Sequence, residues 1–140
     1  MRKIPRYSKV NNIYRFMSNK ANSVFRCESM PEACQALENE LNDNIIYQQA
    51  QPFTMKYLFK GKNHHYTPDF LVKFRSGEWC VLEVKPKDRV EPFLEKFFVI
   101  ETLLKSKDIS FKLCTNDELF DYKNFFKLNR KYVDSFYDKC

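Results

Sequence analysis

The chain has 140 residues and a formal net charge of +6, with 44% hydrophobic and 16% aromatic residues. This length and composition predict one folded domain with a core of its own and argue against intrinsic disorder. Only two glycines occur, which excludes the glycine-rich phosphate loops of most nucleotide-driven enzymes.

The five cysteines show neither a CxxC pair nor a zinc-finger spacing, which argues against a disulfide framework and against structural zinc. Cys80 and Cys114 fall in apolar runs and are expected to be buried thiols. No apolar run approaches the roughly 20 residues that cross a bilayer, and the N-terminus lacks the apolar segment of a secretory signal. We expect a soluble protein of the reducing cytoplasm, without a membrane partner.

The most basic segment is residues 1–27, which contain seven Lys or Arg and no Asp or Glu. We expect a basic N-terminal arm with little regular structure and one short helix near 12–18. Basic arms bind nucleic acid through its phosphates, so Arg2, Lys3 and Arg6 are candidate DNA contacts. A solvated tail is the alternative interpretation.

A helix is predicted to begin near Ser29. The run Ser29-Met30-Pro31-Glu32 places an N-cap serine, a first-turn proline and a glutamate at the third helical position, which is the pattern of a capping box. Apolar residues then recur at helical spacing up to Leu41, before polar residues end the helix.

Four strands are predicted next from alternating or continuous apolar runs between turn residues, at 45–49, 53–59, 66–74 and 78–85. Their short connections predict that the last three form an antiparallel meander.

The spacing then predicts a helix over 90–106, a strand over 109–114 and two aromatic-rich helical segments within 116–140. A strand–helix–strand return is right-handed and roughly parallel. The order of elements predicts a mixed α/β domain, with residues 28–115 as its core and residues 116–140 packed on it.

The most informative feature is Pro68-Asp69, followed fourteen residues later by Glu83-Val84-Lys85. Both runs fall on predicted adjacent strands. Glu83 and Lys85 are two residues apart, so their side chains share one face of the strand while Val84 points into the core. Asp69 can lie opposite them, which brings two carboxylates and an ammonium to one patch.

Such a patch suits phosphodiester hydrolysis. Asp69 and Glu83 would supply hard oxygen ligands for Mg²⁺, for which Mn²⁺ can substitute, and the backbone carbonyl of Val84 would add another. Lys85 would orient or deprotonate the attacking water, or stabilise the developing charge.

Glu32 is the candidate third carboxylate and metal ligand. It is preferred to Glu28 because its place inside the helix fixes its direction. A bare Pro-Asp with a later Glu-x-Lys also arises by chance on exposed strands, and the order of elements around the motif favours function. Gln51 is expected either to structure the site or to be a polar loop residue.

Other polar and aromatic residues have weaker functional interpretations. Lys87 and Arg89 follow the candidate active strand and would either contact phosphate or belong to a solvated loop. His64 and His65 are expected at the surface, facing solvent or DNA, rather than as metal ligands. The aromatic residues within 116–140 are expected to form core or a partner surface rather than to stack on bases.

Four short runs occur in order: ESMPE at 28–32, QPF at 51–53, YTPDFLV at 66–72 and LEVKP at 82–86. Together they resemble the catalytic domain of TnsA-type transposon endonucleases, within the PD-(D/E)xK nuclease superfamily. The resemblance covers about residues 23–115 and implies a restriction-endonuclease-like core, with a mixed central sheet flanked by helices. It implies that Glu32 and Asp69 are metal ligands, that Glu83 is the next acidic position and that Lys85 is the catalytic lysine.

The resemblance implies a Mg²⁺-dependent endonuclease that cuts double-stranded DNA at transposon 5′ ends beside a partner transposase, in a bacterial cell. Two alternatives stay open. One is a compact phage DNA-processing nuclease or Holliday junction resolvase, working as a homodimer or with a phage assembly protein. The other is a non-catalytic DNA-binding or assembly module.

Overall fold

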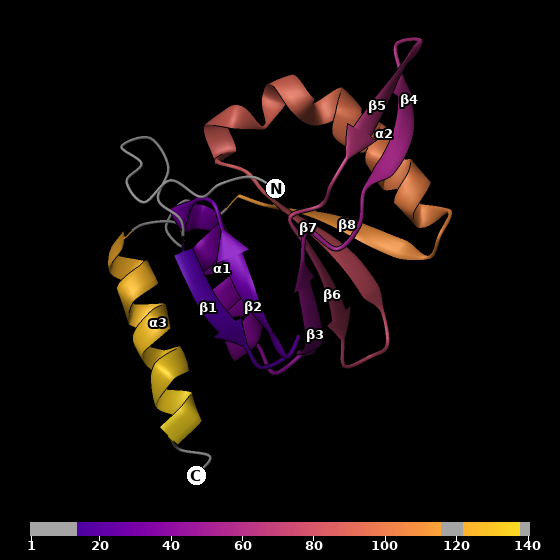
Figure 1. Cartoon of the computed structure of the whole chain (residues 1–140). Helices are drawn as coiled ribbons and strands as arrows, with labels where there is room; N and C mark the ends of the chain where they lie inside the picture. Colours follow the sequence, from indigo (N-terminus) through magenta and orange to yellow (C-terminus); the bar gives the residue numbers. More distant parts are fainter. Residues whose placement is uncertain (1–13, 116–121, 138–140) are drawn as a thin grey trace.

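The computed structural model describes residues 14–115 and 122–137 (Figure 1). Its strands and helices, in chain order, are β1 (Tyr14–Ser18), β2 (Ser23–Cys27), α1 (Met30–Leu41), β3 (Ile45–Ala50), β4 (Met55–Phe59), β5 (Lys62–Tyr66), β6 (Phe70–Phe74), β7 (Trp79–Val84), α2 (Leu94–Lys105), β8 (Ile109–Cys114) and α3 (Tyr122–Tyr137). Two short 3-10 turns, η1 (Lys87–Arg89) and η2 (Glu91–Phe93), precede α2. No helix in these two ranges is long and apolar enough to cross a membrane.

A mixed four-stranded sheet forms the centre of the domain, in the order β3-β6-β7-β8. β6 runs antiparallel to both of its neighbours, whereas β7 and β8 run parallel. The parallel pair follows from the crossover through α2, as a strand–helix–strand return requires. The predicted fold class, an α/β domain with a restriction-endonuclease-like core, is confirmed.

The two faces of the sheet are covered by different elements. Cys80 and Leu82 of β7 pack with α1, β2 and β3 in one core cluster, while Val81 packs with α2 and the β4–β5 hairpin in another. Because side chains alternate along a strand, Glu83 and Lys85 continue the Val81 side, which is the α2 face. The continuous apolar run of β7 therefore reflects burial on both faces.

Helix α1 begins and ends where the sequence predicts. The Ser29 hydroxyl oxygen accepts a hydrogen bond from the Glu32 backbone N–H at 3.3 Å, and Pro31 lies in the first turn. The helix ends at Leu41, with Asn42 as its C-cap residue.

The expectation of an unstructured arm, with a short helix near 12–18, is wrong for residues 14–27. These residues form the antiparallel hairpin β1–β2, whose Phe25 and Cys27 are buried against α1. Arg15 pairs with Arg26 across the hairpin. These charged residues among the apolar ones make the alternating pattern of a half-buried strand hard to recognise in the sequence. Arg2, Lys3 and Arg6 lie outside the described residues.

The strand predicted over 66–74 begins only at Phe70, as β6, whereas Tyr66 ends β5, a strand that was not predicted. β5 pairs with β4 as a separate two-stranded hairpin, while β6 joins the central sheet. Pro68 has no N–H for the ladder and therefore separates the two strands. The predicted antiparallel pairing is confirmed for β6 and β7, but β4 does not join β6.

Two further boundaries differ from the sequence prediction. The helix expected over 90–106 begins at Leu94, after η1 and η2, because Pro92 has no N–H to donate to a preceding turn and is tolerated only in the first turn of a helix. Within 116–140, where two helical segments were expected, the described part is the single helix α3. The strand expected over 109–114 is confirmed as β8.

Candidate active site

Asp69 lies immediately before β6, next to the end of β7. Since Phe70 pairs with Leu82, the next position outward sets Asp69 opposite Glu83. The Val84 backbone N–H donates to Oδ2 of Asp69 at 2.8 Å. The Gln51 N–H donates to the Asp69 carbonyl oxygen at 3.0 Å. Gln51 has a left-handed φ of 42° and so helps to structure this site through its backbone.

Glu83 is fixed by a side chain that the sequence analysis did not identify. The Tyr66 hydroxyl, at the end of β5, donates to Oε1 of Glu83 at 2.7 Å. This bond occupies one carboxylate oxygen and joins the β4–β5 hairpin to β7. A tyrosine hydroxyl two residues before a Pro-Asp pair was the available signal, and it lies within the YTPDFLV run.

Lys85 follows β7 and shares the face of Glu83. Its backbone N–H donates to the Cys114 carbonyl oxygen at 3.1 Å, which extends the parallel pairing of β7 and β8. Its ammonium nitrogen lies 3.7 Å from the centre of the Phe93 ring. A cation over an aromatic face is held electrostatically, so Phe93 is a second residue that sequence reasoning missed.

Glu32 approaches the site from α1, which covers the opposite face of the sheet. Its carboxylate oxygen Oε2 accepts from the Glu28 backbone N–H at 3.4 Å, a variant of the predicted capping box. Glu32 is close enough to Asp69 for the two charges to repel. Both charges also act on the buried thiol of Cys27, whose pKa is raised to about 12 by burial and by the charges of Glu32 and Asp69.

The electrostatics of the three carboxyls are unusual for surface acids. Burial, followed by the charge of Asp69, raises the pKa of Glu32 to about 7. Burial and the charge of Glu83 raise the pKa of Asp69 to about 7, against the lowering effects of the Val84 N–H and Lys85. Burial also raises the pKa of Glu83. Lys85 therefore does not fully compensate the negative charge gathered here.

Uncompensated carboxylate oxygens are the donors that hard divalent cations prefer, and the donor set of Asp69 and Glu83, with Glu32 beside it, fits Mg²⁺. Within residues 14–115 and 122–137, no three His, Cys, Asp or Glu side chains already lie close enough to hold a metal together. Mg²⁺ is commonly held by one or two carboxylates and keeps several waters. The arrangement fits that mode rather than a closed protein cage.

The remaining candidates lie around the site rather than in it. His64 stacks on Tyr57, with ring centres 5.3 Å apart, and His65 is exposed on β5, so neither contacts the carboxyls in any described interaction. Lys87 and Arg89 are exposed in η1. They follow Lys85 closely enough to flank a bound phosphate backbone.

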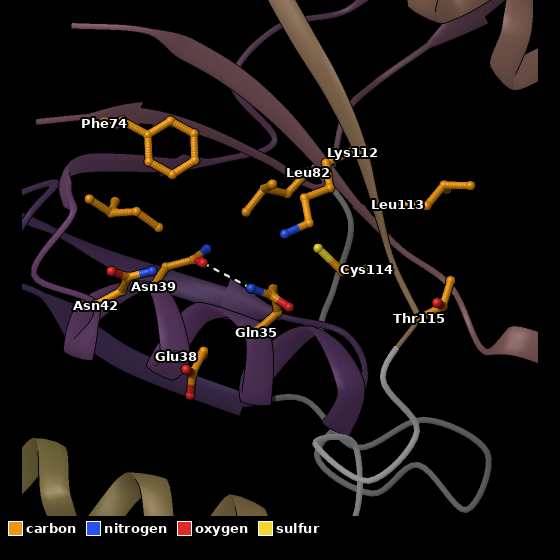
Figure 2. A pocket seen from close by; sticks show the side chains of 11 residues that line it. Gln35, Glu38, Asn39, Asn42, Phe74, Leu82, Lys112, Leu113, Cys114 and Thr115 are labelled. Atoms are coloured by element: carbon orange, nitrogen blue, oxygen red, sulfur yellow. Dashed lines mark hydrogen bonds between the residues drawn. The ribbon is translucent and has the colours of Figure 1, made fainter. Parts of the chain in front are cut away.

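A separate cavity of about 450 Å³ lies between α1 and the end of β8 (Figure 2). Gln35 and Asn39 of α1 line one side, where the Gln35 amide donates to Asn39 at 2.9 Å. Lys112 and Cys114 of β8 line the other. None of the four candidate catalytic residues lines this cavity, so it is distinct from the candidate site.

The family comparison agrees with this geometry. The family model described as "TnsA-like endonuclease N terminal" matches residues 42–116. The matched range includes Asp69, Glu83 and Lys85, whereas Glu32 precedes it. No curated protein matches the chain.

Proposed function

This chain belongs to the TnsA-like endonuclease N-terminal family, and from this membership we propose that it is a metal-dependent endonuclease that hydrolyses phosphodiester bonds in double-stranded DNA. Family membership makes it a nuclease acting on DNA. The metal requirement and the residue roles are the proposal. The observation that carries them is the meeting of Asp69 and Glu83 beside the ammonium of Lys85, at the end of two adjacent strands.

Asp69 and Glu83 would hold Mg²⁺, or Mn²⁺ in its place, with Glu32 and the Val84 carbonyl as further candidate oxygen ligands. When bound, the cation would polarise the scissile phosphate and lower the pKa of a coordinated water. The Val84 N–H donates to one oxygen of Asp69 and the Tyr66 hydroxyl to one oxygen of Glu83, and these bonds would hold the two carboxylates in fixed orientations for the metal.

Lys85 has a different role in the proposal. Its ammonium lies against Phe93 and close enough to Asp69 to lower that residue's pKa. A positive charge fixed beside the scissile phosphate stabilises the negative charge that develops in the transition state. Lys85 would also orient the attacking water by hydrogen bonding.

A non-catalytic DNA-binding module accounts less well for the same residues. Burial, followed by repulsion between neighbouring carboxylates, raises the pKa values of Glu32 and Asp69, so their ionisation destabilises the folded protein without metal. A module that performs no chemistry would be more stable with neutral side chains there.

The test is nicking of supercoiled plasmid by the full chain, with Mg²⁺, with Mn²⁺ and with excess EDTA. We expect cutting with either metal, none with EDTA, and loss of cutting in a folded Lys85→Met variant. The Lys107→Met variant, at an exposed lysine just beyond α2, is the matched control and should retain most of the activity. Metal-independent cutting, or equal cutting by Lys85→Met and the wild type, would contradict the proposal.

A further inference from the structure

The β4–β5 hairpin has two chemically different faces. Its inward face buries Tyr57 and Tyr66 against α2 and the central sheet. Its outward face carries the cross-strand pairs Lys56 with His65 and Leu58 with Asn63, and all four side chains are exposed. Figure 1 shows the hairpin projecting beyond the central sheet, beside α2.

Side chains at the base of the hairpin extend the outward face. The hydroxyl oxygens of Thr54 and Thr67 lie 2.7 Å apart, and both residues are exposed. We call the set Thr54, Lys56, Leu58, Asn63, His65 and Thr67 the outer ribbon face. It consists of hydrogen-bonding side chains and one apolar side chain.

The ionisable side chains of the hairpin and its flanking residues include bases but no carboxylic acids. Between Asp43 and Asp69 the sequence contains no Asp or Glu, but it contains three lysines and two histidines. Lys60, at the tip of the hairpin, forms an ion pair with Glu95 at 3.5 Å, and both side chains remain about three-quarters exposed. Such an exposed pair is weak and does not involve Lys56, so the outer ribbon face keeps the positive charge of Lys56, which suits a polyanion.

The β4–β5 hairpin is also connected directly to the candidate active site. Tyr66, the last residue of β5, donates its hydroxyl hydrogen bond to Glu83, and Asp69 follows three residues later. Thr67, at the base of the outer ribbon face, is two residues from Asp69, so a ligand bound at this base lies close to the candidate site.

We propose that the outer ribbon face is the surface on which double-stranded DNA docks, so that one strand is presented to Asp69 and Glu83. This inference rests on the proposed nuclease function and names the surface that holds its substrate. The major groove, about 12 Å wide, admits a two-stranded β-ribbon. Lys56 contacts phosphate, while Asn63, His65 and the threonines are donors and acceptors for base edges or backbone. Leu58, which is 64% exposed, packs on sugar or on a thymine methyl.

The test measures binding apart from cutting. Fluorescence anisotropy of a labelled duplex is recorded in the Asp69→Asn background, which keeps the DNA intact, for the parent and for Lys56→Gln/His65→Gln. The control is Lys105→Gln/Lys107→Gln, at two exposed residues at the end of α2 and just beyond it. The control removes two formal charges and the ribbon variant removes one, so a larger effect in the ribbon variant cannot come from net charge.

We expect the ribbon variant to raise the Kd for the duplex about tenfold and to reduce the salt slope by about one, with unchanged thermal unfolding. The control should change the Kd less than about twofold, since its lysines lie away from the outer ribbon face. The parent should bind the duplex more tightly than a single strand of the same sequence. Equal effects of the two variants, or a single strand bound as tightly as the duplex, would overturn the docking proposal.

Failure of the docking proposal is distinguishable from failure of the nuclease proposal. If the wild type cuts plasmid and the ribbon variant cuts with the same kcat/KM, docking on the ribbon is wrong and the nuclease stands. If duplex binding depends on the ribbon but no metal supports cutting, the docking surface stands and the nuclease is wrong.

Discussion

The hydroxyl of Tyr66 donates a 2.7 Å hydrogen bond to Oε1 of Glu83. Burial and the negative charge of Glu83 raise the pKa of Tyr66 far above its usual range, so the hydroxyl stays protonated and remains a donor. The bond holds the carboxylate in one orientation. It also connects the projecting β4–β5 hairpin to the strand that carries the candidate metal ligands.

Replacing Tyr66 by phenylalanine should weaken metal binding by roughly tenfold or more, because partners that orient a metal-binding carboxylate contribute about that much. Mn²⁺ affinity, measured by calorimetry, and the nicking rate should fall together. Tyr47→Phe is the control, since the Tyr47 hydroxyl donates only a 3.4 Å bond to Gln49 on β3. Unchanged Mn²⁺ affinity in Tyr66→Phe would show that the hydroxyl does not position Glu83.

The Asp69→Asn variant should be more stable than the wild type in EDTA at pH 8. The folded pKa of Asp69 is about 7 and its ordinary value is 3.8, so ionisation opposes folding above pH 7 and this opposition disappears as the pH falls towards 4. Allowing for partial solvent screening, the gain at pH 8 is about 1–3 kcal/mol. Urea unfolding at pH 8 and pH 4 measures it.

At pH 4 most of the advantage of Asp69→Asn should be lost, because the wild-type carboxyl is then protonated in the folded state and close to its ordinary pKa of 3.8 in the unfolded state. A variant that is less stable than the wild type at pH 8 would show that the Asp69 carboxylate is compensated within the protein. The same variant should lose metal-dependent cutting, which separates its effect on stability from its effect on activity.

Phe93→Leu should slow cutting without unfolding the protein. The Lys85 ammonium lies 3.7 Å from the centre of the Phe93 ring, and a cation–π contact of about 0.5–2 kcal/mol corresponds to a rate loss of about 2- to 30-fold. Phe98→Leu is the matched control, because Phe98 lies in α2, shortly after Phe93, but its side chain is 69% exposed. Equal single-turnover rates for the two variants would exclude a positioning role for Phe93.

Glu40→Gln should destabilise the fold while sparing the candidate active site. Buried Glu40 accepts hydrogen bonds from the Ser18 hydroxyl, the Asn19 backbone N–H and the Tyr132 hydroxyl, which tie β1–β2 and α3 to α1. The side-chain amide of glutamine would place its own N–H donors against the hydroxyl and N–H donors of these partners. We expect this to lower the free energy of unfolding by about 2–3 kcal/mol.

Glu38→Gln, on the same helix and only half-buried, is the control for Glu40→Gln. Chemical denaturation should separate the two variants, while Mn²⁺ affinity should match the wild type in both. Equal unfolding free energies for the two variants would mean that the Glu40 network contributes little.

Local patterns in the sequence were sufficient to predict the central elements. Ser29 and Pro31 predict the start of α1 because they satisfy local requirements of a helix N-terminus. The period of two along β7 is enough to put Glu83 and Lys85 on one face. The positions of Asp69 and Glu83 on adjacent strands follow from the short connection between β6 and β7.

Features that depend on distant packing were not predictable in the same way. The β1–β2 hairpin becomes recognisable only when Phe25 and Cys27 are seen against α1. The roles of Tyr66 and Phe93 depend on the docking of β5 and of the η2–α2 segment beside β7. The split at Pro68 was open to prediction, because a proline inside an expected central strand argues against that strand.

The most direct test of the metal-site proposal is Mn²⁺ binding to the full chain, followed by electron paramagnetic resonance, in the presence of a duplex that cannot be cut. We predict that the wild type binds Mn²⁺ and that Asp69→Asn weakens this binding at least about tenfold. Asp88→Asn, at an exposed carboxylate in η1, should bind as the wild type does. Unchanged binding in Asp69→Asn, or no binding by the folded wild type, would contradict a metal site at Asp69 and Glu83.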